Sequence, residues 1–368
     1  MKRTLYDLDR DDWALAMSGE PKFRVNQLWE GIYGHQLTIP DLTSLPKALR
    51  ERLDAELQPA LTKVTESISD NGETVKFLWE LDGGARVETV LMHYAERSTV
   101  CVSSQAGCAM GCSFCATGQA GFERHLSSGE IVEQVIRAQR LAAAAETPRR
   151  VSNIVFMGMG EPLANFDNTW TAVRRIHDDI GIGARHITLS TVGLIPGILR
   201  LAEEPMQVNL AVSLHAADNQ LRDELVPINR RYPLEALMDA CATYFGSTRR
   251  RVSFEWAMID GVNDRMSDAD ALAALCQPIR AHVNLIPLNP TPGYAVRGSS
   301  RNRVNAFRDR LDELGVTVTV RDTRGSEIDA ACGQLRAGHQ ATPVSRPVRR
   351  ATPADSCDPA DSWDPADS

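Results

Sequence analysis

The feature that most limits the possible folds is an alternation of short apolar runs and longer amphipathic stretches between residues 99 and 321. The apolar runs predict strands at 99–104, 153–157, 186–190, 208–214, 252–259, 283–287 and 316–321. Apolar residues at helical spacing predict helices that include 128–145, 168–179, 234–245, 267–279 and 301–314. About six β-α units of this kind require a parallel sheet covered by helices, and an α/β fold with a partial TIM-type (β/α)6 barrel is the natural closure.

Other patterns flank this alternation. Residues 1–60 carry apolar side chains at helical spacing, interrupted by Pro40 and Pro46, and predict a small helical accessory domain. Residues 61–104 change to a period of two around the turn at 82–84, which predicts a β-hairpin extension that leads into the first core strand. The barrel is expected over residues 105–336. Residues 337–368 end in a near-repeat of Pro, Asp and Ser, which predicts a disordered acidic tail.

Three cysteines, Cys108, Cys112 and Cys115, stand as C-x3-C-x2-C in the loop after the first predicted core strand. Three thiolates on one tight loop can hold three irons of a 4Fe-4S cluster and leave the fourth iron open to a ligand. The alternative is a structural zinc site with Cys101 or His125 as the fourth ligand, although zinc motifs usually come as two separated pairs. Function collects at the carboxyl ends of barrel strands, so chemistry is expected at this loop.

Polar residues follow several of the other predicted strands. The glycines of the segment 158–162 (GMGEP) allow backbone to approach a ligand closely, and the carboxylate of Glu161 can accept a hydrogen bond from an amino group. Ser190, Ser213, His215 and Asn289 lie at or just after the ends of later strands. Each alone is more often an ordinary strand cap, but together they predict one site with the hydroxyl, imidazole and amide groups that suit a nucleoside cofactor.

Two further cysteines lie where a thiol could react. Cys332 follows the last predicted strand and Cys101 lies within the first core strand, so one could act as a nucleophile and the other could resolve a thioether. Cys241 and Cys276 are predicted to be small buried hydrophobic residues. No apolar run approaches the ~20 residues of a membrane helix and the start lacks a secretory signal, which predicts a cytoplasmic protein with reduced thiols.

The net charge of −8 argues at first against a nucleic-acid partner. Five aspartates in the last eighteen residues account for most of it, however, and residues 1–350 carry only −3. Arginines then cluster at 149–150, 174–175, 230–231, 249–251 and 297–303. Most such clusters are solvated surfaces, so charge alone leaves an RNA partner open.

Five segments together carry a specific resemblance: GCAMGCSFCATGQAGF, MGMGEPL, SLHA, VNLIPLNP and TRGSEIDAACGQL. They resemble the bacterial dual-specificity RNA methyltransferases of the radical S-adenosylmethionine (SAM) superfamily, and the likeness covers nearly all of residues 1–336. It implies methylation of C2 of adenosine 2503 in 23S ribosomal RNA and of adenosine 37 in transfer RNA. The family commonly has Asn where His125 stands, and the acidic repeat tail is additional, but neither has an assigned role.

The resemblance also implies roles for individual residues. Cys108, Cys112 and Cys115 would hold one 4Fe-4S cluster per chain. Two SAM molecules would be consumed per turnover, bound by Gly160, Glu161, Ser190, Ser213, Leu214, His215 and Asn289. Cys332 would carry the methyl group as S-methylcysteine and then a covalent RNA adduct, Glu88 would accept the proton from C2, and Cys101 would release the RNA by forming a transient disulfide with Cys332.

The implied partners are 23S ribosomal RNA, transfer RNA and an electron donor of the flavodoxin or ferredoxin type, with no membrane partner and a monomeric chain. Two alternatives stay open. A sibling enzyme that methylates C8 of the same ribosomal adenosine shares the cluster, the cofactor motifs and both thiols. A non-catalytic RNA-binding protein with a structural zinc site belongs to a different class.

Overall fold

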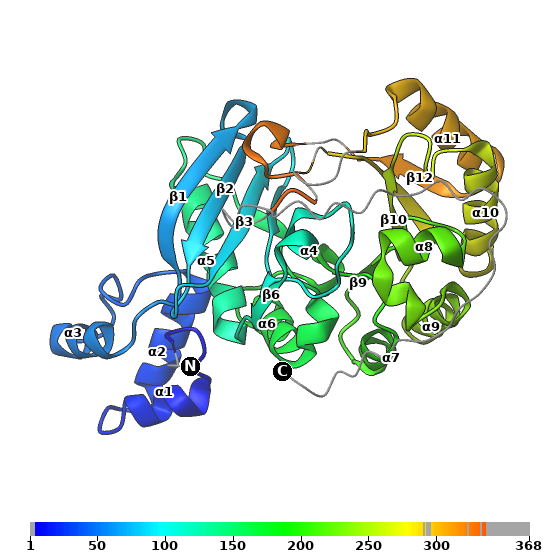
Figure 1. Cartoon of the computed structure of the whole chain (residues 1–368). Coiled ribbons are helices and arrows are strands. Elements are labelled where there is room, and N and C mark those ends of the chain that lie inside the picture. Colours follow the sequence, from blue (N-terminus) through cyan, green and yellow to red (C-terminus); the bar gives the residue numbers. More distant parts are fainter. Residues whose placement is uncertain (1–3, 290, 292–295, 322–323, 332, 336–368) are drawn as a thin grey trace.

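The computed structural model describes residues 4–289, 291, 296–321, 324–331 and 333–335 (Figure 1). Within these residues ten strands form one sheet in the order β1-β2-β3-β4-β7-β8-β9-β10-β11-β12. From β4 onward each strand pairs in parallel with the next. These strands are β4 (Ser98–Cys101), β7 (Val151–Phe156), β8 (Ile187–Thr191), β9 (Asn209–Ser213), β10 (Val252–Met258), β11 (His282–Pro287) and β12 (Thr317–Val320).

Helices connect the parallel strands, as parallel pairing requires. They are α5 (Ser128–Ala144), α6 (Phe166–Asp178), α7 (Ile195–Glu203), α8 (Asn219–Leu225), α9 (Leu234–Thr248), α10 (Met266–Cys276) and α11 (Arg301–Glu313). Short helical turns add η3 (Pro162–Asn165), η4 (Ala184–His186), η5 (Pro227–Arg230), η6 (Gln277–Ile279) and η7 (Ser326–Ile328). Six β-α units followed by β12 confirm the predicted α/β fold of the partial-barrel type.

Two of these helices, α7 and α8, were absent from the sequence prediction. Pro196 and Gly197 fall in the first turn of α7, and both residues weaken a helical signal although proline is tolerated there. The α8 helix has only seven residues, too few to show a clear apolar period. The sequence therefore failed to predict those connecting helices that are short or that contain residues unfavourable to a helix.

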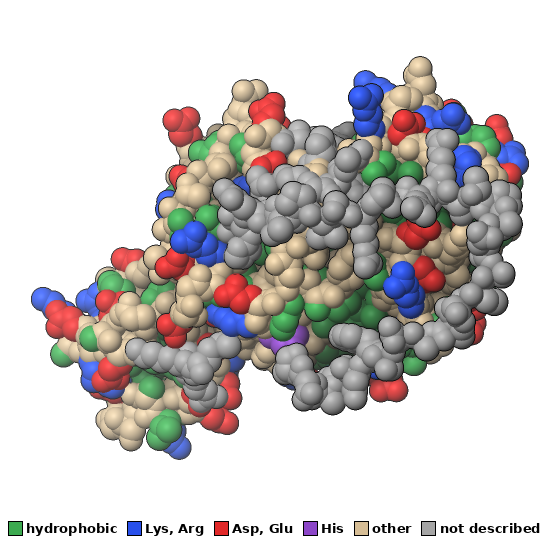
Figure 2. Space-filling view, in the orientation of Figure 1, with side chains coloured by type: hydrophobic (Ala, Val, Ile, Leu, Met, Phe, Trp, Pro, Cys, Tyr) green, Lys and Arg blue, Asp and Glu red, His purple; other side chains and the backbone are tan. Residues whose placement is uncertain are grey.

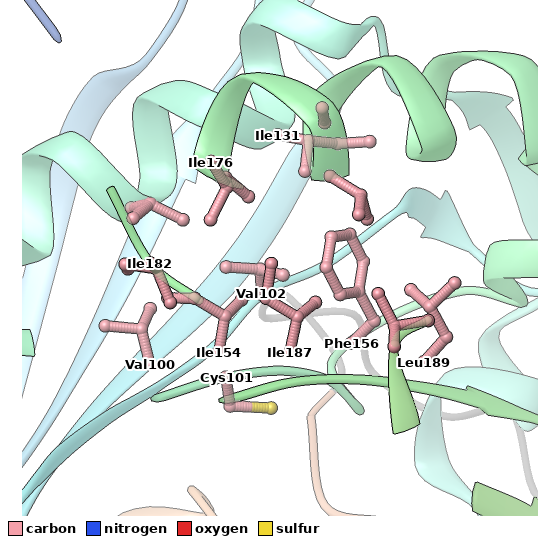
Figure 3. Packing of buried hydrophobic residues seen from close by; sticks show 14 of the residues in the cluster. Val100, Cys101, Val102, Ile131, Ile154, Phe156, Ile176, Ile182, Ile187 and Leu189 are labelled. Atoms are coloured by element: carbon pink, nitrogen blue, oxygen red, sulfur yellow. The ribbon is translucent and has the colours of Figure 1, made fainter. Parts of the chain in front are cut away.

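The core between the sheet and its outer helices is apolar. Figure 3 shows Val100, Val102, Ile154 and Ile187 of neighbouring strands pointing toward the side on which Ile131 of α5 and Ile176 of α6 lie. Cys101 points to the opposite side of its strand, as alternation along a strand requires. One side chain of β4 thus faces the inside of the curved sheet while its neighbours fill the core.

The predicted hairpin is part of a three-stranded antiparallel extension. It consists of β1 (Thr62–Ser69), the turn η2 (Asp70–Gly72), β2 (Thr74–Glu80) and β3 (Arg86–His93). Because β3 pairs with β4, the extension continues the main sheet. The sequence did not predict β1 as a separate strand because it is an edge strand with mostly exposed residues and little apolar alternation.

The first core strand also ends earlier than predicted. After Cys101 the chain turns into β5 (Gln105–Gly107), which pairs with β6 (Phe122–His125) in a separate small sheet. Between them lie the cysteine loop and α4 (Ala116–Ala120), which Figure 1 shows between the antiparallel strands on one side and β9 and β10 on the other. The loop is therefore held at both ends by strand pairing.

The amino-terminal segment is helical, with α1 (Arg10–Ala16), α2 (Phe23–Trp29), the π-helical turn η1 (Glu30–Gly34) and α3 (Lys47–Glu56). It packs on α5 and α6 through an apolar core shared with the sheet. The indole of Trp29 donates to Asp179 at 2.8 Å, and the backbone N–H of Gly129 donates to Asp7 at 2.9 Å. The division of the chain into separate domains stays a prediction, and the predicted tail at 337–368 lies outside the described residues.

Candidate active site

A pocket that is open on one side lies at the carboxyl ends of β7 to β11, and its empty space, open solvent included, is about 1000 Å³. All three cysteines of the motif line it. Six of the seven residues predicted to bind SAM also line it: Gly160, Glu161, Ser190, Ser213, His215 and Asn289. We call it the cluster pocket. The fold thus brings together residues spread over more than 180 positions of the chain, because parallel strands all end at one edge of the sheet.

The seventh residue, Leu214, does not line the pocket. Its side chain is fully buried in the apolar core. Its backbone N–H donates to the carbonyl of Glu255 at 3.1 Å. Leu214 can therefore reach a ligand in this pocket only through its backbone.

The cysteine loop is closed by backbone hydrogen bonds. The N–H of Cys108 donates to Gly121 at 2.7 Å, and the N–H of Cys115 donates to Cys112 at 3.1 Å. Gly107 has a φ of +74°, and a Cβ atom there would lie 2.0 Å from the carbonyl oxygen of Gly121. A larger residue at 107 would push the two ends of the loop apart.

The thiols fit a cluster. Burial raises the pKa of Cys108 to about 12 and that of Cys112 well above its usual value, so both are protonated until a metal displaces the proton. Among the described residues no three His, Cys, Asp or Glu side chains converge on a single ion. A 4Fe-4S cluster does not need such convergence because each thiolate binds its own iron.

Glu161 lies at the back of the pocket with 2% of its surface exposed. Its carboxylate accepts the backbone N–H groups of Leu163 at 3.1 Å and Val192 at 2.9 Å. Burial raises the pKa of Glu161 to about 7, and these N–H groups oppose the shift. The carboxylate therefore joins the ends of β7 and β8 while remaining next to the space for a ligand.

His215 is a neutral imidazole. Its Nδ1 accepts the backbone N–H of Ala257 at 3.0 Å, which places the proton on Nε2. Burial, aided by the charge of Arg222, lowers the pKa of His215 to about 3. Its ring packs edge-on against Phe114 of the cysteine loop, with 4.7 Å between the ring centres. His215 can thus donate one hydrogen bond from a fixed ring at neutral pH.

Sequence reasoning missed two charged groups at this pocket. Glu255, 4% exposed, and Arg321 both line it, and their side chains lie 3.9 Å apart. A carboxylate within the apolar strand 252–259 was a signal that could have identified Glu255. The third missed residue is Arg222, which has no exposed surface and donates to the carbonyls of Val192, Ser213 and Leu214. Arg222 lies on α8, one of the two helices that the sequence did not predict.

A second pocket adjoins the cluster pocket and shares Met157, Ile286, Asn289 and Arg321 with it. Its empty space, open solvent included, is about 1450 Å³, and its walls include Cys101. Cys101 is 7% exposed and pairs with Val90 of β3 in the sheet register. We call it the release pocket. Cys101 therefore lies beside the predicted radical site but not among the cluster ligands.

Glu88 is buried, with 3% of its surface exposed, whereas the sequence alone would make it an exposed hairpin residue. It lies two residues from Val90 on β3 and thus on the same face of the sheet as Cys101. Its carboxylate pairs with Lys76 of β2 at 3.2 Å. Register between three strands, rather than sequence proximity, brings Lys76, Glu88 and Cys101 to one face.

The segment 324–335 runs from this face to the cysteine loop, in so far as its residues are described. At one end Arg324 donates to Glu73 at 2.9 Å, and Lys76 donates to the carbonyl of Asp329 at 3.2 Å. At the other end the N–H of Ala116 donates to Gly333 at 2.8 Å. Cys332 lies outside the described residues. Of its neighbours, Ala331 lines the release pocket and Gly333 lines the cluster pocket.

The coloured surface in Figure 2 shows Lys and Arg side chains in small groups among Asp and Glu. The arginine clusters of the sequence do not merge into one broad basic area on the visible part of this face. In the described part of the chain, no helix is both long and apolar enough to cross a membrane.

Comparisons with known proteins point in one direction. The sequence profile of the radical SAM superfamily matches residues 102–273. Probable dual-specificity RNA methyltransferases RlmN from Parafrankia sp. and Chloroflexus aurantiacus are 52% and 51% identical to the chain. The first match covers 91% of this chain and 92% of the relative, and the second covers 94% and 95%.

Among solved structures, a radical SAM methyltransferase from Sphaerobacter thermophilus superposes with a TM-score of 0.88 at 49% identity. The match covers 91% of this chain and all of that one. A non-catalytic zinc protein does not fit these relatives.

Proposed function

Because the chain belongs to the family of dual-specificity RNA methyltransferases within the radical SAM superfamily, we propose that it methylates C2 of adenosine 2503 in 23S ribosomal RNA and of adenosine 37 in transfer RNA. The observation that carries the proposal is the pair of adjoining pockets, one lined by three thiols and the other by Cys101. A cluster pocket alone would suit many radical reactions. A second thiol next to it suits one in which an RNA adduct must be released.

Different residues of the cluster pocket would bind the cluster and SAM. Cys108, Cys112 and Cys115 would bind the 4Fe-4S cluster, which together with SAM supplies a radical able to remove a hydrogen atom from a methyl group. Adenine C2 is an electron-poor carbon, so ordinary displacement on a sulfonium methyl group cannot alkylate it. His215 would donate a hydrogen bond to SAM from Nε2, and Ser190 can accept one since its hydroxyl already donates to Phe156 at 2.8 Å.

The release pocket would hold the covalent chemistry. In this proposal the thiolate of Cys332 takes a methyl group from one SAM, and that carbon later bonds to C2 of the target base. The bond to C2 forms after one hydrogen atom has been removed from that carbon. Glu88 then accepts the proton from C2, and the unpaired electron left on the base would pass to the oxidised cluster, which restores the aromatic ring. Cys101 attacks the sulfur of Cys332, the bond between that sulfur and the former methyl carbon breaks, and the carbon takes up a proton, so that methylated RNA leaves and a disulfide forms. The buried ion pair with Lys76 supports the role of Glu88, because it holds the carboxylate in a fixed position on the face of the sheet that carries Cys101.

The reaction site on the base is tested by mass spectrometry of nucleosides from ribosomal and transfer RNA of a deletion strain, its parent and a complemented strain. We expect 2-methyladenosine to disappear in the deletion strain and to return on complementation. The sibling activity would instead give 8-methyladenosine, and that result would contradict the proposal. The relatives' name favours the dual-specificity enzyme over its sibling.

The role of Cys332 is tested separately. Cys332→Ala is expected to abolish methyl transfer while iron and sulfide content stay at the parent level, because the cluster ligands are other residues. Cys241→Ala is a suitable control, since Cys241 is fully buried and lines neither pocket. Normal product formation by Cys332→Ala would overturn the covalent route.

We further propose that the chain acts as a cytoplasmic monomer and that a flavodoxin or ferredoxin reduces both the cluster and the disulfide. Two SAM molecules per methylated base follow from the proposed route, one as methyl donor and one as radical source. Quantifying S-adenosylhomocysteine and 5′-deoxyadenosine against product tests this ratio, and a one-to-one-to-one result supports it.

A further inference from the structure

Arg222 is a buried cation whose role the proposed reaction leaves open. It lies on α8, has no exposed surface, and donates four hydrogen bonds. Three go to backbone carbonyls, those of Val192 at 2.7 Å, Leu214 at 3.1 Å and Ser213 at 3.2 Å. The fourth goes to the side chain of Asn229 at 2.8 Å. Its hydrogen-bonding capacity is therefore well used.

The positive charge of Arg222, by contrast, has no carboxylate beside it in the described part of the chain. Among the described residues no carboxylate lies within ion-pair distance of the guanidinium. Asp223 acts on the guanidinium from beyond ion-pair distance and is linked to it through Asn229, whose amide donates to Asp223 at 2.6 Å. Burial of a cation without a counter-charge is strongly unfavourable, so proteins rarely keep one unless an anion is present in the working state.

The predicted cluster ligand Cys112 is the candidate for that anion, because its loop contacts the end of α8. The N–H of Ser113 donates to the carbonyl of Leu225 at the end of α8, at 3.2 Å. Cys112 packs with Leu225 and Val226 in one apolar cluster. The guanidinium of Arg222 also donates to the carbonyls of Val192 and Ser213, and both residues line the cluster pocket. Burial lowers the pKa of Arg222 to about 10, so it stays protonated at neutral pH.

We propose that Arg222 is the counter-charge of the bound cluster and that it favours cluster reduction. The inference rests on the proposed function, because it needs the 4Fe-4S cluster on Cys108, Cys112 and Cys115. Three thiolates give the oxidised cluster a net negative charge, and one electron from a low-potential donor of the flavodoxin or ferredoxin class adds another. A fixed cation nearby stabilises the more negative, reduced form, since net charge is one determinant of cluster potential.

The same side chain is also a positioning residue. The carbonyls that it joins belong to residues at or just after the ends of β8 and β9, next to Ser190, Ser213 and His215. One guanidinium thus ties together two strand ends of the predicted SAM site and places a positive charge behind the cluster loop. Lysine can supply the charge but not the planar set of donors.

The test compares Arg222→Gln, Arg222→Lys and the matched control Arg175→Gln. Arg175 is also buried and donates to backbone carbonyls, those of Tyr6 and Asp7, but it lines neither pocket. Each purified protein is reconstituted anaerobically with iron and sulfide. The midpoint potential is then measured by dithionite titration followed by electron paramagnetic resonance, and thermal unfolding of each apoprotein is recorded in parallel.

We expect Arg222→Gln to lower the equilibrium constant for reduction at least tenfold, a shift of about 59 mV to more negative potential for a one-electron couple. Arg222→Lys should stay within threefold of the parent, and Arg175→Gln should match the parent. An unchanged potential in Arg222→Gln, or an equal shift in the lysine variant, would overturn the proposal.

If the glutamine variant takes up no iron, the lysine variant decides. An Arg222→Lys protein that takes up the cluster and shows the midpoint potential of the parent supports the counter-charge role. A folded Arg222→Lys protein that also takes up no iron contradicts it. This measurement uses no RNA, so it is independent of whether the enzyme methylates C2. A parent protein that binds no cluster would instead refute the proposed function itself.

Discussion

The cluster pocket and the release pocket adjoin each other but are built in opposite ways. The three thiols of the first come from one loop of eight residues, closed by backbone hydrogen bonds and buried in apolar surroundings. The walls of the second come from β3, β4, β7, β11, β12 and the segment 324–335, and long-range hydrogen bonds between this segment and β2, β3 and Glu73 hold it in place. A local motif thus makes the proposed cluster site, whereas contacts between distant segments make the proposed release site. Substitutions in one pocket should therefore leave the properties of the other pocket unchanged.

The largest expected effect is on the cluster pocket. Cys112→Ala should remove one of three cluster ligands, so iron content falls sharply and no methylated RNA forms. Cys276→Ala, which replaces a buried cysteine far from both pockets, should keep the iron and the activity. Iron and sulfide analysis with an RNA methylation assay checks both. A catalytically active Cys112→Ala protein would remove this loop from the mechanism.

The next largest effect is expected from a substitution in the release pocket. Cys101→Ala should keep the full iron content but accumulate RNA bound covalently to the protein, because the resolving thiol is missing. Denaturing gels of reactions with labelled RNA measure the adduct, and turnover beyond the first cycle should fall at least 100-fold. If the variant turns over normally and no RNA-linked protein appears, Cys101 has no part in release.

A smaller effect is expected from the buried ion pair on the same face of the sheet as Cys101. Lys76→Met leaves the buried carboxylate of Glu88 without its cation, so the free energy of unfolding should fall by about 3 kcal/mol. Lys63→Met breaks the exposed pair with Glu66 on the same extension and should cost only about 0.5 kcal/mol. Urea unfolding of the two apoproteins gives the comparison. Equal losses would show that the Lys76 pair is not a buried support.

The last prediction concerns pH and the cluster pocket. The folded protein holds the Glu161 proton up to a pKa of about 7, above its ordinary value of 4.5. Between these two pH values the folded state binds more protons than the unfolded state, so this group makes stability fall as pH rises. Glu161→Gln should remove this decrease. Relative to the difference at pH 4.5, the free energy of unfolding of the variant should exceed that of the parent by up to about 3 kcal/mol at pH 7.

The comparison must be made as a difference between the two apoproteins. His215 acts in the opposite sense, because its pKa is lowered to about 3 and its contribution to stability grows as pH rises from there to 6.5. The two groups partly cancel in the parent. A parent-minus-variant difference that stays constant from pH 4.5 to 7 would contradict the raised pKa of Glu161.

The sequence predicted the strands and helices where their patterns were long and regular. It also predicted most of the cluster pocket, because residues at the ends of parallel strands must meet at one edge whatever the details of packing. It missed α8 and therefore Arg222, since a seven-residue helix has little periodicity. It could not show that Glu88 is buried and paired, because that depends on which residues of β2 and β3 face each other.

The sequence by itself determined the chemistry that this chain can support: three thiols at a spacing that suits a cluster, polar groups at strand ends, and a fold in which those groups converge. Only the tertiary structure decided the surroundings of those groups. It determined that the carboxylate of Glu161 is buried, that the imidazole of His215 is neutral and that the guanidinium of Arg222 has no exposed surface. The reason is physical: residue identity and short-range spacing are written in the chain, whereas desolvation and charge pairing arise from long-range contacts that no local pattern contains.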